Sequence, residues 1–367
     1  MSKLFEKYKL RGIEFRNRIW VSPMCQYSSE NGMPTDWHLV HLGSRAVGGA
    51  GLVIMEATAV SPEGRISPSD AGIWSDAHAE AYKKITAFIK SNGAIAGIQI
   101  AHAGRKASTN EPWNGDGKVD ENGGGWETVA PSAIAFNENY PQPREMNSHD
   151  IEQATNDFVA AAKRSVEAGF EVIEIHAAHG YLFHEFFSPL SNKRADEYGG
   201  NLENRMRFPL EVSRRVRDVV PENLPVFVRI SATDWTDGGW DLEQSIEFCK
   251  QLKEVGIDLI DVSTGGNVPH ARIPVAPNYQ VPFAAEIRKA VKIATAAVGM
   301  ITEPKQAEEI LQKGEADAIL IARESLREPY FSFRAARELG ESVDVPKQYG
   351  RAIQLESAQE VRSAGKK

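Results

Sequence analysis

Residues 151–176 read IEQATNDFVAAAKRSVEAGFEVIEIH, and this stretch holds a helix pattern followed by a strand pattern. Its first part carries helix-forming residues up to a glycine and predicts a helix over Ile151–Ala168. Its last part, Val172–His176, is almost continuously apolar, which is typical of a strand buried on both faces of a parallel sheet. Helices that alternate with buried strands are the mark of an α/β fold.

The same unit recurs along the 367 residues. Apolar runs predict eight strands, at Ile19–Val21, Leu52–Glu56, Ala96–Ile100, Val172–His176, Val226–Ile230, Leu259–Val262, Ile293–Ala296 and Ala318–Ile321. Between most of them we predict helices, at Ser75–Lys90, Ile151–Ala168, Asn204–Val219, Leu242–Val255, Pro282–Ala290 and Pro304–Lys313. This pattern favours one (β/α)8 TIM barrel over an open sheet. We therefore expect a single domain over residues 1–367, with a C-terminal tail over about 340–367.

One segment interrupts the alternation. Gly104–Asp150 follows the third predicted strand and is rich in Gly, Asn and Pro. A loop at this point lies on the carboxyl-terminal face of a barrel, where such loops shape active sites. The alternative is a disordered insertion, but Trp113, Trp126 and the apolar run Ala130–Phe136 predict a packed loop.

Composition narrows the classes of function. The formal net charge of −8 argues against a nucleic-acid surface and against an anionic-membrane surface, because both require basic patches. The two cysteines, Cys25 and Cys249, imply no disulfide framework and suit a reducing compartment. No apolar run reaches membrane-spanning length. We expect a soluble cytoplasmic protein without a nucleic-acid or membrane partner.

Polar residues gather where the predicted strands end. In a TIM barrel, chemistry takes place at these ends, and polar groups there are costly unless they meet a ligand or one another. One such residue alone is more often structural, but here several strand ends supply them together. The segments are Ser22–Tyr27, Glu56–Thr58, Gln99–Lys106, His176–Tyr181, Arg229, Val298–Met300 and Ala322–Arg323.

His176 and His179 are the most distinctive pair. If the strand ends at His176 and a turn follows, both imidazoles can face one pocket. The spacing also suits zinc, but no third ligand is obvious beside the pair, so we predict no metal site. Two imidazole N–H groups would instead polarise a carbonyl or nitro oxygen. Tyr181 is a candidate proton donor, with simple packing as the alternative.

Several motifs, in order along nearly the whole chain, resemble the old yellow enzyme family. The resemblance is closest to its bacterial YqjM-type and xenobiotic-reductase-like branch. The matching segments are Asn17–Ile19, Ser22–Tyr27, Gln99–Lys106, Gly125–Thr128, Ala130–Ile134, His176–Pro189, Tyr198–Asn201 and Glu203–Arg205. The resemblance implies an ene-reductase in which NADPH or NADH reduces noncovalent FMN. The FMN then passes hydride to Cβ of an activated alkene.

The resemblance also implies roles for single residues. The flavin ring would contact Pro23, Met24, Cys25, Ala57 and Gln99. Arg229 would lie at the N1 and O2 edge, where a positive charge stabilises the anionic reduced flavin. The flavin phosphate would be held by Gly299, Met300, Ala322 and Arg323.

On the substrate side, the resemblance implies that Tyr27, His176 and His179 bind the activating oxygen of the alkene. Tyr181 would protonate Cα, and Cys25 would tune the flavin without acting as a nucleophile. Arg351 would enter the site of a neighbouring subunit, which predicts a homodimer or homotetramer.

Two positions depart from the family pattern. Ala322 stands where members usually have glycine, and Ile353 stands where relatives commonly place an aromatic residue. Two other functions stay open. One is another FMN barrel oxidoreductase, such as a dihydroorotate or amine dehydrogenase, and the other is a noncatalytic flavin-binding barrel.

Overall fold

A computed structural model describes residues 2–115 and 117–352, and its centre is a closed barrel of eight parallel strands. In barrel order the strands are β3 (Ile19–Val21), β4 (Leu52–Ala59), β5 (Ile95–Ala101), β8 (Val172–Ala177), β9 (Val226–Ser231), β10 (Leu259–Ser263), β11 (Ala294–Ala297) and β12 (Ala318–Ile321). Pairing of β12 with β3 closes the barrel. The predicted TIM barrel is confirmed, and every predicted strand overlaps an observed one.

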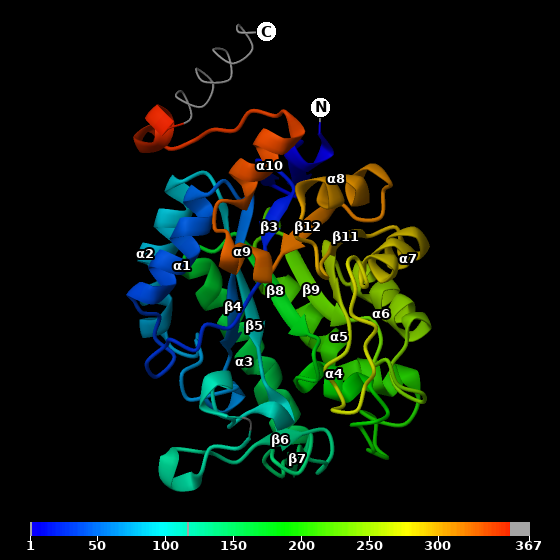
Figure 1. The fold of residues 1–367 in the computed structure, drawn as a ribbon. Helices are drawn as coiled ribbons and strands as arrows, with labels where there is room; N and C mark the ends of the chain where they lie inside the picture. The colour runs from blue at the N-terminus through cyan, green and yellow to red at the C-terminus, as the bar shows by residue number, and fades with distance from the viewer. Residues whose placement is uncertain (1, 116, 353–367) are drawn as a thin grey trace, which may run out of the picture.

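Helices surround the barrel (Figure 1). They are α1 (Asp36–Val47), α2 (Asp76–Ser91), α3 (Ser148–Glu167), α4 (Leu182–Phe187), α5 (Leu202–Val219), α6 (Leu242–Glu254), α7 (Val281–Val291), α8 (Pro304–Gln312), α9 (Arg323–Arg327) and α10 (Phe331–Leu339). Side chains of Asn147, Asn201 and Asp241 cap α3, α5 and α6 by accepting backbone N–H groups of the first turn. These caps fix where each helix begins after its loop.

Helix α1 was not predicted from the sequence. It buries His38, His41 and Arg45 against the barrel while Trp37 and Val40 remain exposed. Leu42 and Ala46 are buried as well, so the buried face of this helix mixes apolar and polar side chains, and an apolar-spacing pattern does not reveal it.

An antiparallel hairpin covers the amino-terminal end of the barrel. Its strands are β1 (Tyr8–Leu10) and β2 (Ile13–Phe15), and β2 leads directly into β3. The ring of Phe15 lies 4.6 Å from that of Trp20, which stacks at 5.7 Å on Phe227 inside the barrel. These aromatic side chains fill this end, so the opposite end is the one available for a ligand.

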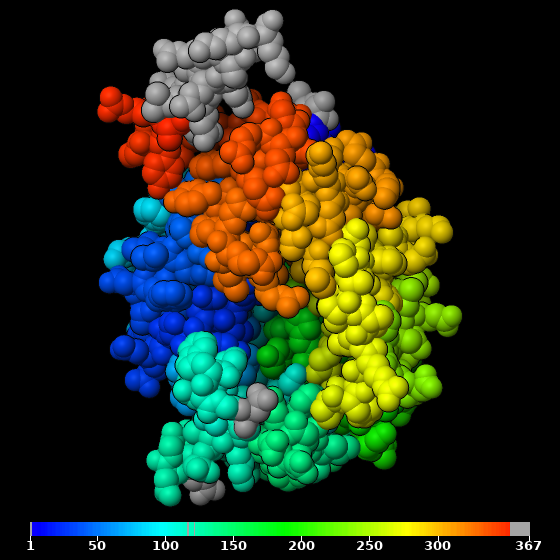
Figure 2. All heavy atoms as spheres, in the orientation of Figure 1, coloured from blue at the N-terminus to red at the C-terminus, as the bar shows by residue number. Residues whose placement is uncertain are grey.

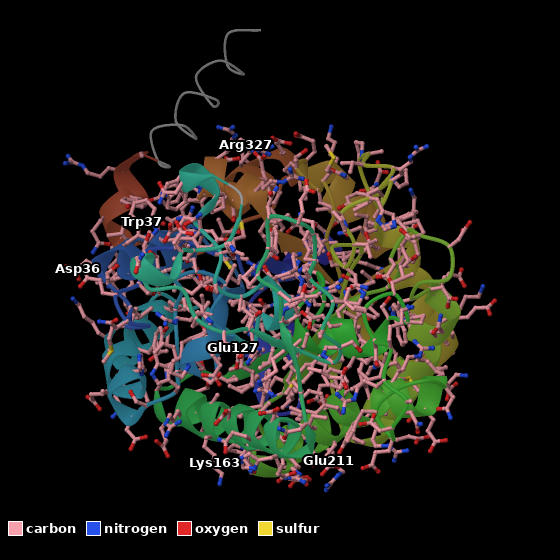
Figure 3. The ribbon with its side chains drawn as sticks, turned by 90° about the horizontal axis from the view of Figure 1, so that it is seen from below. Asp36, Trp37, Glu127, Lys163, Glu211 and Arg327 are labelled. Carbon is pink, nitrogen blue, oxygen red and sulfur yellow. The ribbon has the colours of Figure 1, made fainter. Side chains whose placement is uncertain are left out.

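The carboxyl-terminal face carries the long loop after β5, as predicted. The loop contains the short parallel pair β6 (Val129–Ala130) and β7 (Arg144–Glu145). Figure 2 shows a hollow in this face, with green surface at its floor and blue, cyan, yellow and orange segments around it. In the view from the side of β6 and β7, the exposed Glu127 of the loop projects near the middle of the picture, whereas Lys163 of α3 and Glu211 of α5 lie at the edge (Figure 3).

The two tryptophans of the long loop behave differently. Trp126 is half-buried, donates its indole N–H to the Glu63 carbonyl at 2.9 Å and carries Arg65 over its ring. Trp113 is 67% exposed and contributes little to the packing of the loop. Its ring instead meets the ring of Tyr27 edge-on at 5.7 Å, beside the hollow.

After α10 the described part of the chain runs on to a 3-10 turn at Lys347–Tyr349. The Tyr349 hydroxyl lies 3.2 Å from that of Tyr330, which attaches this turn to the start of α10. Ile353, one of the two departures from the family pattern, lies outside the described residues. Among the helices that the structure describes, none is both long enough and apolar enough to cross a membrane.

Candidate active site

Three predicted site residues meet at the end of β8. The strand stops at Ala177 and the chain turns back through His179 (φ +59°) and Gly180 (φ +73°). This turn brings the imidazole of His179 to 5.2 Å from that of His176, at an interplanar angle of 78°. The ring of Tyr181 lies 5.0 Å from His176. The turn after the strand therefore brings both histidines and the tyrosine together, as the sequence predicted.

Both histidines are held neutral. Burial lowers the pKa of His176 and of His179 well below the ordinary value, and the positive charge of Arg229 lowers each further. A neutral imidazole donates one N–H and accepts at its other nitrogen. Nε2 of His179 lies 2.7 Å from Ser263 Oγ, whereas Nδ1 of His176 is buried and has no hydrogen-bond partner among the described residues. Within the described ranges, no cluster of three His, Cys, Asp or Glu side chains is arranged to hold a metal ion.

The end of β3 supplies a thiol and a second phenol. Cys25, Tyr27 and Tyr181 pack around a small apolar cluster of Ile66, Ala103 and Ala107. Tyr27 is hydrogen-bonded to Cys25. Burial, together with the charge of Asp70, raises the pKa of the Cys25 thiol well above its ordinary value. The sulfur is therefore a neutral thiol at neutral pH, which is a weak nucleophile.

Below the histidines lies a layer of buried charge. Nε of Arg229 on β9 is 3.0 Å from a carboxylate oxygen of Asp261 on β10. Nε2 of Gln99 on β5 donates to Glu174 on β8 at 2.8 Å. Burial and the nearby Asp261 raise the pKa of Glu174 to about 8. The layer therefore combines one guanidinium with two buried carboxyl groups and an amide.

A cavity of about 280 Å³ opens beside this layer, between the ends of β9 to β12. Its lining includes Arg229, Ser263, Gln280, Gly299, Met300, Ala322, Arg323 and Arg327. Gly299 has φ +128°, a conformation that L side chains rarely adopt, and a Cβ there would lie 3.1 Å from Gln280. Three arginine side chains, together with the backbone at Gly299, form a cradle for an anionic group in this cavity. Ala322 has φ −98° and ψ −108°, a pair of angles outside the main allowed regions for L residues, at the position where family members usually have glycine.

Residues 3–342 match the NADH:flavin oxidoreductase / NADH oxidase family. The chain belongs to this family. A relative named NADPH dehydrogenase from Listeria monocytogenes is 51% identical over 354 residues, which cover 96% of this chain and 99% of the relative. Another of that name from Geobacillus sp. is 49% identical over 350 residues, covering 95% and 98%. This flavin oxidoreductase is thus an enzyme that uses FMN and a nicotinamide.

Solved structures agree with the family. Morphinone reductase superposes with a TM-score of 0.77 at 26% identity, covering 94% of this chain and 92% of that one. The old yellow enzyme homologue from Zymomonas mobilis gives 0.76 at 28%, covering 95% and 96%. A 2-naphthoyl-CoA reductase gives 0.83 at 26%, covering 92% of this chain and 52% of that one.

The described residues of this flavin oxidoreductase fit FMN. The arginine-lined cavity suits the phosphate, and the orphaned polar atoms of the buried layer suit a polar ring edge. Pro23 is buried just after β3 and Ala57 is buried near the end of β4, with Met24 half-buried next to Pro23. Arg351 is exposed in the tail, beyond the turn that Tyr349 attaches to Tyr330, and is not part of this grouping in its own chain.

Two polar residues of the site, Ser263 and Gln280, were not predicted from the sequence, and Lys106 was predicted only as part of the segment Gln99–Lys106. Ser263 ends β10 and contacts both His179 and Gln280. Lys106 donates to the carbonyls of His179 and Gly266, each at 2.9 Å, and so joins the ends of β8 and β10. The signal for Ser263 was available, because it is a polar residue that ends a buried strand. Gln280 begins α7, where no strand-end rule applies.

Proposed function

We propose that this flavin oxidoreductase is an ene-reductase that reduces alkenes activated by a carbonyl or nitro group. The observation that supports the proposal is the meeting of His176, His179 and Tyr181 above the buried charge layer, with Tyr27 alongside. Neutral N–H donors and a phenol are the groups that such a reaction needs at the substrate's oxygen and at Cα. We also propose that the protein acts in the cytoplasm.

In this proposal the protein residues divide the work. Bound FMN supplies the hydride, which it first receives from NADPH or NADH. His176 and His179 donate hydrogen bonds to the activating oxygen of the substrate, and Tyr27 adds a third. Tyr181 donates its phenolic proton to Cα. Arg229 keeps a fixed positive charge at the flavin edge.

A two-step anaerobic titration tests the proposal. The holoenzyme is first bleached with NADPH or, separately, with NADH, and 2-cyclohexenone is then added. We expect the oxidised flavin spectrum to return with formation of one cyclohexanone per flavin. Bleaching of the oxidised flavin by dihydroorotate or by an amine, with no reoxidation by the enone, would favour another FMN dehydrogenase. No bleaching with either nicotinamide would favour a noncatalytic barrel.

We predict that Cys25→Ala shifts the flavin reduction potential and retains substantial turnover. The neutral thiol touches Tyr27 and lies at a strand end that faces the hollow, so its loss changes the flavin surroundings without removing a nucleophile. Potentiometry and steady-state rates with 2-cyclohexenone are the measurements. Complete loss of turnover with FMN still bound would contradict this role.

We also propose that the enzyme is a homodimer or homotetramer whose sites are completed in trans by Arg351. The described tail carries Arg351 exposed to solvent, close in sequence to Tyr349, which is itself 40% exposed. Ordering an arginine in a polar tail costs conformational entropy, and a polar pocket in a neighbouring subunit would offset that cost.

For Arg351→Ala we expect KM for the alkene to rise about tenfold, the effect of losing one charge-assisted hydrogen bond, while FMN stays bound. Sedimentation of the wild type at the assay concentration shows whether the active enzyme is an oligomer. A fully active monomer would remove the trans role and leave the barrel chemistry unchanged.

A further inference from the structure

Two buried pairs of histidine and carboxylate lie behind the site, and the proposed reaction uses neither. His184 of α4 faces Asp234 in the loop after β9, with Nε2 and Oδ1 2.7 Å apart and both side chains fully buried. His38 of α1 faces Glu56 of β4, with Nε2 and Oε1 3.1 Å apart. Burial of ionisable groups is costly, so two such pairs beside one site call for a physical reason.

The first pair holds the turn after β8. The backbone N–H of Gly180 donates to Nδ1 of His184 at 3.0 Å. A ring nitrogen that accepts carries no proton, so the proton of neutral His184 is on Nε2 and points to Asp234. Desolvation alone would raise the pKa of Asp234, but His184 and hydrogen bonds such as that from Ser188 lower it below the ordinary value. A charged, multiply bonded carboxylate therefore fixes the histidine that holds Gly180.

The second pair holds the backbone at the end of β3. The backbone N–H of Gln26 donates to Oε2 of Glu56 at 2.5 Å. Nδ1 of His38 accepts the backbone N–H of Thr35 at 2.9 Å, so its proton is on Nε2, which lies 3.1 Å from Oε1 of Glu56 and 3.4 Å from Oγ of Ser29. Here the carboxylate contacts the backbone and the histidine lies close beside it, whereas in the first pair the histidine contacts the backbone and the carboxylate is hydrogen-bonded to the histidine.

Both turns contain a strained residue that faces substrate in the proposed function. His179 has φ +59° and Tyr27 has φ +50°. Residues other than glycine keep such conformations only where their surroundings impose them. In each turn the amide that is held belongs to the neighbour of the strained residue: Gly180 follows His179, and Gln26 precedes Tyr27.

We propose that His184–Asp234 and His38–Glu56 are two independent clamps that fix the turns presenting His179 and Tyr27 before substrate arrives. The four residues act through the turns and are positioning residues. Hydrogen-bond donors that are already in position need no reordering when a ligand binds, and this lowers the dissociation constant of the ligand. The proposal rests on the proposed function in one respect: the ligand group that the two turns contact is taken to be a carbonyl or nitro oxygen.

Two pairs of variants test the clamps. His184→Leu removes the acceptor for Gly180, whereas His184→Asn offers an oxygen near the position of Nδ1. At the other turn, Glu56→Leu removes the acceptor for Gln26, whereas Glu56→Gln keeps an amide oxygen. The conservative member of each pair should therefore rescue what the leucine variant loses.

Thr86→Val is the matched control. It breaks a buried hydrogen bond from Thr86 Oγ1 to the Ala168 carbonyl, 2.6 Å long, between α2 and the end of α3. This bond resembles the clamp bonds in burial and in having a backbone partner, but it touches neither turn. Any effect common to all three sites is therefore a general effect on stability.

The readout is the dissociation constant of cyclohexanone from oxidised holoenzyme, followed by flavin absorbance. This saturated ketone offers the oxygen without a reducible alkene. We expect about tenfold weaker binding in each leucine variant and about a hundredfold in the double variant, since separate contributions add as free energies. His184→Asn, Glu56→Gln and Thr86→Val should bind within about threefold of wild type. Full affinity in both leucine variants, or equal weakening in Thr86→Val, overturns the clamps.

Amide hydrogen exchange of the wild-type holoenzyme tests the same idea without any variant, and so remains decisive if a leucine variant does not fold. The amides of Gly180 and Gln26 should exchange at least about a hundredfold more slowly than that of the exposed Gly115. Exchange as fast as Gly115 overturns the clamps. Slow exchange in an enzyme that leaves enones unreduced would instead overturn the proposed function and leave the clamps in place.

Discussion

Replacement of Tyr181 by phenylalanine should slow reduction of an activated alkene by about a hundredfold to ten-thousandfold, the range that loss of a general acid typically costs. The ring that lies 5.0 Å from His176 is retained, so the substitution removes the hydroxyl alone. Burial raises the pKa of this phenol well above its ordinary value, which keeps the proton in place for donation at neutral pH.

Stopped-flow measurement of the two half-reactions checks this expectation. Reduction of the enzyme by nicotinamide should proceed near the wild-type rate, because no carbon is protonated in that step. Tyr27→Phe is the comparison, since Tyr27 is a second phenol beside the same apolar cluster and is assigned only to binding. Equal slowing of both half-reactions in Tyr181→Phe would show that the hydroxyl shapes the site and does not donate the proton.

Replacement of Arg229 by methionine should lower the free energy of unfolding by about 3–5 kcal/mol, the usual cost of leaving a buried charge without its partner. Asp261 lies 3.0 Å from Arg229 and is fully buried. The double variant Arg229→Met with Asp261→Asn should recover most of this loss, because no unpaired carboxylate remains. Chemical unfolding of both variants with saturating FMN is the measurement, and equal losses in the two would contradict the charge explanation.

The same variant should show a distinctive dependence on pH. In the wild type, burial raises the pKa of Asp261 to about 6 even with Arg229 beside it. Without the arginine this pKa rises further, so the folded variant keeps a proton that the unfolded chain loses above about pH 4. Its stability relative to wild type should therefore fall as the pH rises from 5 to 8, which unfolding curves across that range would show.

The barrel could be predicted from the sequence because its strands are buried on both faces and read as apolar runs. The grouping of His176, His179 and Tyr181 was predictable for a related reason, since a strand end and a turn are local features. Helix α1 could not be found in this way, because it buries His38 and His41 and exposes Trp37.

Contacts between distant segments were also beyond the sequence. His184 and Asp234 are 50 positions apart, and no local pattern links a histidine in a short helix to an aspartate in another loop. The same holds for Trp113, whose place against Tyr27 depends on the path of a long loop. Such pairs become visible only when the barrel has brought the strand ends to one face.

The loops after β8 and β10, which are in contact, also limit which substitutions this site can accept. A Cβ on Gly180 would lie 2.3 Å from the Gly266 carbonyl oxygen, and a Cβ on Gly266 would lie 2.7 Å from the backbone of His179. Neither glycine can be exchanged alone, because each loop occupies the space that the other would need. A mutant library aimed at new substrates should therefore leave both positions fixed and sample the β5 loop, where Trp113 stands exposed and an altered side chain meets solvent. Differences in substrate range among close relatives should concentrate in the same loop.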